Sequence, residues 1–177
     1  MARTGIALGS NLGDRPANLR AALDGLREIA AKDAPTLVAS LYETAPVGCP
    51  GDSPAFLNTV VEIEWPGTPL ELLDRTRALE SRIGRAPNPV RNAPRIIDID
   101  ILYSGDATVD SAQLTLPHPR MAGRRFVLLP LAEIRPDFRP NHGGPGVADM
   151  LAALEHDESP PARVEATCWP LTGCASR

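Results

Sequence analysis

The sequence predicts an α+β protein with a ferredoxin-like βαββαβ core: an antiparallel sheet with helices packed on one face, followed by extra C-terminal elements. Four segments, 4–9, 36–44, 57–65 and 95–102, are rich in residues that favour strands or alternate as strands do. Two segments with apolar residues at helical spacing lie between them, so the order is β-α-β-β-α-β. With 177 residues and 43% hydrophobic content, the chain is long enough for one domain with a sizeable core.

The first predicted strand leads into a turn-rich junction at 9–13. This junction has neither the glycine spacing nor the lysine of a phosphate-binding P-loop, so a bound nucleotide must be held by other residues. Asp14 is a candidate N-cap for the next helix, and Pro16 suits its first turn. Apolar residues at helical spacing over 19–30 predict that one face of this helix packs on the sheet.

The second predicted helix has a sequence signal at each end. Thr68 and Glu71 have the spacing of a capping box, and Pro69 stands at the first helical position. Gly84 is a typical residue at a helix end, because glycine adopts the left-handed conformation easily. We therefore expect a helix that begins at Pro69 and stops at Gly84.

Two long loops, 45–55 and 85–94, connect the core elements. Both exceed the two to five residues of a tight hairpin, and long loops in compact domains often bind ligands or close over them. The second loop holds three prolines and two arginines, which predicts a stiffened, positively charged flap. A plain surface loop is the alternative.

The C-terminal third is less regular. After a turn at 104–106 we expect another short strand, a loop around His118, a helix that carries Phe126, and a short helix near 147–154. Residues 157–177 lack clear periodicity, so we divide the chain into a domain at 1–156 and a loosely packed tail at 157–177.

Two acidic residues stand out in the last strand of the predicted core. Asp98 and Asp100 alternate with isoleucines, so both carboxylates lie on one face, about 6–7 Å apart along the strand. A polar strand face exposed to water is the ordinary interpretation. However, aspartate is depleted in strands and two like charges repel each other, so a hard cation between them is the more economical explanation.

The charge distribution indicates an anionic ligand. The net charge of −4 argues against a general nucleic-acid binder, yet eight arginines face five acidic residues between Arg77 and Arg125. Arginine suits bidentate contacts with phosphate. Paired aspartates, nearby arginines and two long loops together predict metal-assisted phosphoryl transfer, although regulatory ligand-binding domains and small phosphatases share this architecture.

Other features restrict the cellular setting. The three cysteines form neither a zinc spacing nor an even disulfide framework, which favours reduced thiols. No apolar run reaches the roughly 18–20 residues of a membrane span, and the N-terminal residues do not resemble a signal peptide. We expect a cytoplasmic protein with small-molecule substrates, no nucleic acid, no membrane and no obligate protein partner.

Several motifs, taken together and in order from about residue 5 to 137, resemble the 6-hydroxymethyl-7,8-dihydropterin pyrophosphokinase family of folate biosynthesis. The two most specific are Pro-Arg-x-x-Asp-x-Asp-x-Leu at 94–102 and Pro-His-Pro-Arg-Met at 117–121. The others are Gly-Ser-Asn-Leu-Gly at 9–13, Tyr-Glu-Thr-Ala-Pro-Val-Gly at 42–48, Phe-Leu-Asn at 56–58, Gly-Arg at 84–85 and Arg-Arg-Phe at 124–126.

This resemblance implies that ATP donates its β,γ-pyrophosphoryl group to the pterin hydroxymethyl oxygen and leaves as AMP. The implied catalytic residues are Arg85, Arg95, Asp98 and Asp100, with Asp98 and Asp100 as ligands of two Mg²⁺ ions. The implied contacts of the co-substrate ATP are Glu80, Arg85, Arg91, Arg95, Ile101, Thr115, His118 and Arg124. The implied pterin contacts are Thr44, Val47, Gly48, Phe56, Asn58, Asp98 and Phe126.

One departure from the family pattern concerns the flap. Asn92 and Ala93 stand where the family usually has Trp-Gly, and that tryptophan helps to seal the site. Two alternatives therefore stay open. One is a slow or inactive paralogue that binds pterin or nucleotide, and the other is a metal-dependent phosphohydrolase on the same fold.

Overall fold

The computed structural model of the chain describes residues 1–46, 53–86, 93–140, 143–154, 160–165 and 169. The predictions for Val47, Gly48, Arg91 and Asn92 lie outside these residues. The elements, in chain order, are β1 (Ala2–Ser10), α1 (Arg15–Ile29), β2 (Leu37–Val38), β3 (Leu41–Thr44), β4 (Phe56–Trp65), α2 (Pro69–Ile83), β5 (Asp98–Ser104), β6 (Val109–Asp110), β7 (Thr115–Leu116), the 3₁₀-helix η1 (Met121–Gly123), α3 (Arg125–Ile134), α4 (Val147–Ala153) and β8 (Ala162–Val164).

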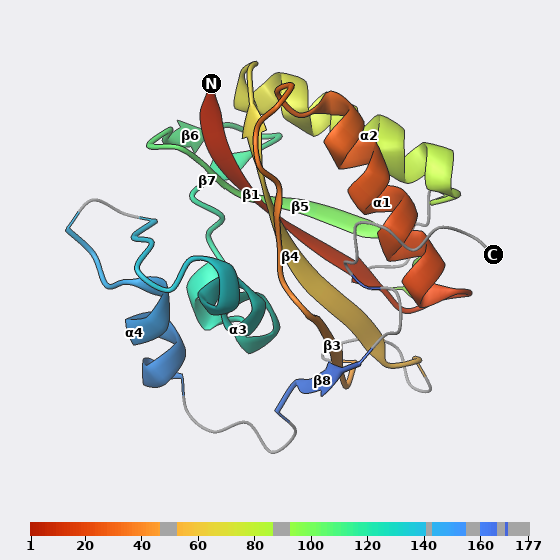
Figure 1. Ribbon diagram of the computed structural model, residues 1–177. Helices are drawn as coiled ribbons and strands as arrows, with labels where there is room; N and C mark the ends of the chain where they lie inside the picture. The colour runs from red at the N-terminus through yellow and green to blue at the C-terminus, as the bar shows by residue number, and fades with distance from the viewer. Residues whose placement is uncertain (47–52, 87–92, 141–142, 155–159, 166–168, 170–177) are drawn as a thin grey trace.

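One antiparallel sheet organises the fold. Its strand order is β5-β1-β4-β3-β8, and β2 pairs with β4 beside β3. Helices α1 and α2 cover one face, whereas α3 and α4 lie on the other (Figure 1). The predicted βαββαβ core is thus confirmed with its two helices on one face, and the helices after β5 are the extra C-terminal elements.

The helix ends follow the signals read from the sequence. Asp14 caps α1 by accepting a hydrogen bond from the backbone N–H of Ala17 at 3.1 Å. Thr68 and Glu71 form the capping box of α2 in both directions. Gly84 ends α2 in the left-handed conformation, with a φ of 112°. Local side-chain chemistry therefore decides where both core helices begin and where α2 stops.

Two predicted strand boundaries need correction. The last core strand begins at Asp98 rather than at residue 95. The backbone ahead of it instead bonds to the end of β1 and the residue after it: Asn11 N–H donates to the Arg95 carbonyl, and the Ser10 hydroxyl donates to the Ile96 carbonyl. The segment 36–44 is not one continuous strand but two short ones, β2 and β3.

The C-terminal segment also departs from the expectation of loose packing, at least where it is described. Strand β8 extends the sheet by pairing with β3, with Arg163 opposite Tyr42. Trp169 packs against the core, and its indole N–H donates to the Ala39 carbonyl at 2.9 Å. Backbone hydrogen bonds and apolar burial thus attach β8 and Trp169, the parts of this segment that the structure describes, to the sheet. The boundary at 156 stays a prediction.

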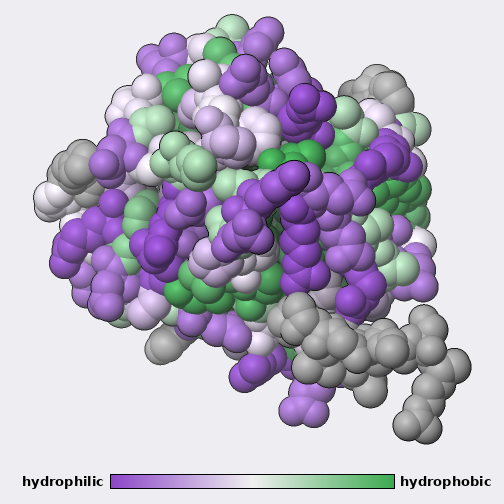
Figure 2. Space-filling view, turned by 45° about the horizontal axis from the view of Figure 1, so that its top comes forward, coloured by the Kyte–Doolittle hydropathy of each residue, from purple (hydrophilic) through white to green (hydrophobic). Residues whose placement is uncertain are grey.

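Apolar side chains pack on both faces of the sheet. One cluster lies under α1 and α2, and the other joins the sheet to α3 and α4. The visible surface is mostly hydrophilic with small hydrophobic areas (Figure 2). Within the described residues, no helix combines the length and apolar character needed to cross a bilayer.

The second cluster requires an unusually close approach of β1 to an aromatic ring. A Cβ atom at Gly5 would lie 2.2 Å from a ring carbon of Tyr103. That ring cannot move away easily, because its hydroxyl donates to the buried Glu62 at 2.6 Å and its face packs on Phe138 with centroids 4.0 Å apart. Glycine at this position is therefore a packing requirement.

We predict that Gly5→Ala destabilises the protein by about 2–3 kcal/mol, the upper range for overpacking a core. Urea unfolding measures the change in the free energy of unfolding. Gly123→Ala is the matched control, since a Cβ there would meet nothing within 4 Å. Equal stabilities for the two variants would contradict the packing argument.

Candidate active site

A cavity of about 300 Å³ lies on the α3 side of the sheet. Strands β1, β3, β4 and β5, the segments that flank β5 on its N-terminal side, and the start of α3 all contribute to its lining. The predicted site residues that line it are Thr44, Phe56, Asn58, Arg85, Arg95, Asp98, Asp100, Arg124 and Phe126.

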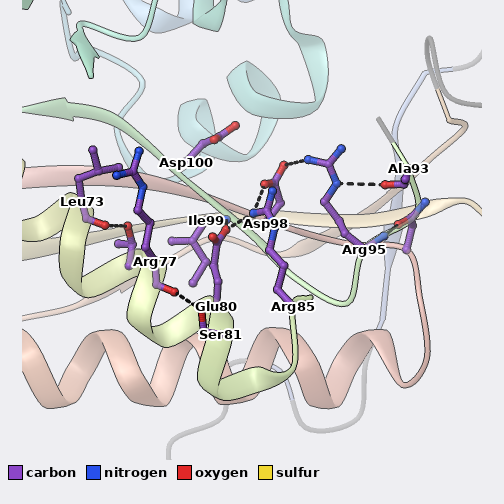
Figure 3. A network of polar contacts seen from close by, with 12 residues as sticks. Leu73, Arg77, Glu80, Ser81, Arg85, Ala93, Arg95, Asp98, Ile99 and Asp100 are labelled. Atoms are coloured by element: carbon purple, nitrogen blue, oxygen red, sulfur yellow. Dashed lines mark hydrogen bonds and ion pairs between the residues drawn. The ribbon is translucent and has the colours of Figure 1, made fainter. Parts of the chain in front are cut away.

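The acidic pair lies on this face because of the strand period. Ile99 and Ile101 are buried on the opposite face, against α1 and α2, so Asp98 and Asp100 both face the cavity. The Asp98 carboxylate accepts hydrogen bonds from Arg85 at 2.7 Å and from Arg95 at 3.0 Å (Figure 3). Arg124 lies 3.5 Å from the Asp100 carboxylate. Each carboxylate thus has at least one arginine beside it.

Glu80 supports β5 in the structure, and the nucleotide contact that the family resemblance implies for it stays a prediction. It does not line the cavity; its carboxylate accepts a hydrogen bond from the backbone N–H of Ile99 at 2.8 Å and pairs with Arg85 (Figure 3). Burial raises the pKa of Glu80, while Arg85 and the Ile99 hydrogen bond oppose that rise. Glu80 therefore connects the end of α2 to the middle of the acidic motif and holds Arg85 near Asp98.

The surroundings of Asp100 disfavour its ionised form. Burial raises its pKa, and the charge of Asp98 raises it further, although His118, Arg124 and Arg120 oppose the rise. Burial also lowers the pKa of His118, so the imidazole is held towards its neutral form despite the nearby carboxylate. The ionised form of Asp100 would consequently gain from an additional cation in the cavity.

Other residues of the lining suit a flat heterocycle. Phe56 and Phe126 contribute aromatic surface to the cavity, with the Arg124 guanidinium 5.5 Å from the Phe126 ring centroid, and the Asn58 amide donates to the Thr44 hydroxyl oxygen at 2.8 Å. With that bond made, the Thr44 hydroxyl can donate to a ligand and the Asn58 carbonyl oxygen can accept from one. A Cβ at Gly9 would approach that oxygen to 3.0 Å, so glycine keeps the floor of the site open.

Besides Glu80, three predicted residues with described positions lie outside the cavity lining. The Ile101 side chain is buried in the core, so its backbone is the part that remains for a ligand. Thr115 is exposed on β7. His118 is half-buried, and its backbone N–H donates to the Leu102 carbonyl at 2.8 Å, which keeps it beside β5. Their contacts with a nucleotide stay predictions.

Sequence reasoning missed several residues of the lining. Arg120 was quoted within the Pro-His-Pro-Arg-Met motif but not selected as a site residue, although its charge acts on both Asp100 and Arg124. Its motif position was the available signal. Gly9 and Ala45 also lie within the family motifs and carry the same signal. The remaining missed residues, for which the sequence carries no comparable signal, are Ala7, Leu8, Thr59 and Val127.

The donor set fits magnesium if phosphate completes the coordination shell. Across the described ranges, no cluster of three or more His, Cys, Asp or Glu side chains has the arrangement of a metal site. Asp98 and Asp100 offer carboxylate oxygens on one open cavity wall. Mg²⁺ commonly binds through one or two carboxylates together with water and substrate phosphates, so the pair suffices for such a site.

Comparison with known proteins shows similarity over most of the chain. A family model described as 7,8-dihydro-6-hydroxymethylpterin-pyrophosphokinase (HPPK) matches residues 5–136. A relative from Bacillus subtilis, named 2-amino-4-hydroxy-6-hydroxymethyldihydropteridine pyrophosphokinase, is 49% identical over 129 residues, which cover 73% of this chain and 75% of the relative. A Pseudomonas aeruginosa protein with the same name is 39% identical over 151 residues, covering 85% of this chain and 91% of that protein.

Solved structures agree on the fold. The wild-type HPPK-DHPS protein of Plasmodium falciparum with pteroate superimposes with a TM-score of 0.66 at 16% identity. The match covers 85% of this chain but 42% of that one, so this chain spans less than half of that longer protein. At this level of identity, the similarity concerns the fold.

We predict that Glu80→Ala lowers the free energy of unfolding by about 1–3 kcal/mol, because it leaves the buried Ile99 N–H without its acceptor. Urea unfolding tests this change. Ser81→Ala on the exposed side of α2 removes a hydroxyl that donates to the Arg77 carbonyl and serves as the control. A loss no larger than that of the control would contradict the connecting role of Glu80.

The raised pKa of Asp100 predicts a pH-dependent effect on stability in metal-free buffer. A carboxyl group with a raised folded-state pKa costs stability when ionised, and the cost disappears as the pH falls towards its ordinary value. Asp100→Asn should therefore be more stable than the wild type at pH 7, and the difference should shrink towards pH 4.

Urea unfolding with a chelator at several pH values measures this difference, and Asp24→Asn on the exposed side of α1 controls for the change in net charge. A destabilising or pH-independent effect of Asp100→Asn would contradict the prediction.

Proposed function

Since the chain belongs to the 7,8-dihydro-6-hydroxymethylpterin-pyrophosphokinase family, it transfers pyrophosphate from ATP to hydroxymethyldihydropterin in folate biosynthesis, and we propose that the cavity beside β5 is where it does so. One observation carries the assignment of the site. The acidic pair Asp98 and Asp100, with their arginines, shares a cavity with Phe56 and Phe126. Residues suited to phosphate and residues suited to a heterocycle therefore line one cavity, and Asp98 is the residue that we assign to both halves of the site.

The phosphate half would bind ATP through the acidic pair and the arginines. Asp98 and Asp100 would hold two Mg²⁺ ions, which supply charge neutralisation and orientation of the phosphates when bound. Arg85 and Arg95 already point at the Asp98 carboxylate, so they lie where anionic oxygens can replace or share that partner. Their guanidinium groups would stabilise the charge on the transferring group.

The pterin half would orient the acceptor hydroxymethyl group. Phe56 and Phe126 offer aromatic faces for the ring, while the Thr44 hydroxyl and the Asn58 carbonyl offer one donor and one acceptor for its edge. Because Asp98 belongs to both halves, a pterin bound in this way would bring its hydroxyl group towards the phosphates. We assign no general base, since a loose phosphoryl-transfer transition state needs little proton removal.

The flap bears on rate rather than on the identity of the reaction. Ala93 is 8% exposed, and its carbonyl accepts a hydrogen bond from the Arg95 Nε at 3.3 Å, so the backbone at this position contacts a proposed phosphate ligand. Retention of both aspartates and of Arg85 and Arg95 favours turnover over mere binding. A slow enzyme with an altered flap is the second candidate.

Formation of AMP from ATP and magnesium, with and without 6-hydroxymethyl-7,8-dihydropterin, tests the reaction. We expect AMP that depends on the pterin. ADP and phosphate released without the pterin would indicate a phosphohydrolase instead, and nucleotide binding without AMP would indicate an inactive paralogue.

In the same assay we predict that Asp98→Ala and Asp100→Ala each lower kcat by at least about a hundredfold, because metal-held phosphate stabilisation is worth several kcal/mol. The control is again Asp24→Asn, whose carboxylate lies on α1 at the helix surface. Near-normal turnover in either alanine variant would remove the metal-site assignment.

A further inference from the structure

The backbone that leads from β2 into β3, the strand that carries Thr44, has one residue more than the part of β4 opposite it. Val38 pairs with Val61 and Tyr42 with Asn58, so three residues lie between the pairs on the β2–β3 side and two on β4. The unmatched segment, Ala39 and Ser40, is a β-bulge between β2 and β3. Strand β4 is continuous over its ten residues, so the irregularity belongs to the β2–β3 side.

Because of this bulge, each residue of β3 points to the opposite face of the sheet from the one it would have in a regular strand. Val38 and Leu41 are three apart and both pack in the core under α1 and α2, whereas the period of two would place them on opposite faces. Without the extra residue, Thr44 would share the face of Val38 and point towards α1 and α2. With it, Tyr42 faces α3 and Thr44 lines the cavity.

A carboxylate on α3 holds the bulge from outside the cavity. Glu133 accepts hydrogen bonds from the Ser40 N–H at 2.9 Å and from the Ser40 hydroxyl at 2.7 Å. It also accepts one from the Tyr42 hydroxyl at 3.1 Å, so it contacts both the bulge and a residue that the bulge has reversed. Three donors converging on one carboxylate favour the bulged register over a regular one, in which they would separate.

Two further donors hold the other residue of the bulge. The Ala39 carbonyl accepts from the Thr59 hydroxyl at 3.0 Å and from the Trp169 indole at 2.9 Å. The Ala39 N–H in turn donates to the Val60 carbonyl at 3.0 Å. The bulge thus accepts hydrogen bonds from β4 and from Trp169, and it donates hydrogen bonds to α3 and to β4.

We propose that Glu133 is a positioning residue for pterin binding: it stabilises the bulge at Ala39 and Ser40 and thereby orients Thr44 towards the substrate. This inference rests on the proposed pterin role of Thr44. Glu133 does not line the cavity, so its effect passes through the register of β3 and the Thr44–Asn58 pair. Arg85, Arg95 and the acidic pair lie on other elements, so the ATP half should be unaffected.

The first measurement is steady-state kinetics of Glu133→Ala. We expect the KM for the dihydropterin to rise roughly fivefold to tenfold, the worth of one lost hydrogen bond, with the KM for ATP within about twofold of the wild type. Ser40→Ala should shift the same KM in the same direction by less. Glu133→Gln, which keeps an acceptor oxygen at the same place, should restore most of the wild-type value.

Thr4→Val is the matched control, because it removes a buried hydrogen bond to Ser104, at 3.0 Å, elsewhere in the sheet. It should lower the free energy of unfolding, but it should not change the KM for the dihydropterin relative to the KM for ATP. A Glu133→Ala variant that raises both KM values equally, or neither, would overturn the inference and leave Glu133 a general structural residue.

The second measurement needs no substrate. Nuclear Overhauser contacts between Tyr42 and Asn58 report the bulged register, and they should weaken in Glu133→Ala but persist in Thr4→Val. Unchanged contacts in Glu133→Ala would overturn the inference even if the wild type formed no pterin-dependent AMP. If the wild type formed no pterin-dependent AMP and Glu133→Ala lost the contacts, the result would count against the proposed function but would support the role of Glu133 in the register.

Discussion

Two carboxylates on one face of β5 repel each other, and much of the surrounding structure follows from this constraint. Asp98 lies between Arg85 and Arg95, and Asp100 lies near Arg124, so positive charge offsets the repulsion before any ligand binds. The offset is incomplete, since the pKa of Asp100 is raised. A site in this condition favours further cations, and phosphates can in turn exchange for the carboxylates as arginine partners.

The two faces of the sheet have different roles: one packs against helices, and the other carries the site. On one face, the isoleucines of β5 pack under α1 and α2, and Glu80 bonds to the Ile99 backbone, so the acidic strand is held from behind. On the other face, the acidic pair of β5, Phe56 of β4 and Phe126 of α3 line one cavity. Rigid packing on one face thus positions chemistry on the other, which is how a small domain can place charges without losing its core.

Some of this arrangement could be read from local pattern. The period of two places Asp98 and Asp100 on one face wherever the strand lies, and the capping signals at Asp14, Thr68 and Gly84 act within a few residues. The bulge at Ala39 and Ser40 had no comparable signal. Its hydrogen-bond partners come from residues as far along the chain as Glu133 and Trp169, so short-range pattern could not reveal it.

The sequence by itself determined the order of the core elements, the starts of the two core helices, the end of α2, the shared face of the acidic pair and, through its motifs, the family of the reaction. These properties depend on side-chain periodicity and local backbone chemistry. The tertiary structure decided that Glu80 supports β5, that Arg120 joins the cavity lining, and that Thr44 faces the cavity rather than the core. Each of these depends on contacts between segments distant in sequence, where burial and competition for hydrogen-bond partners select the final geometry.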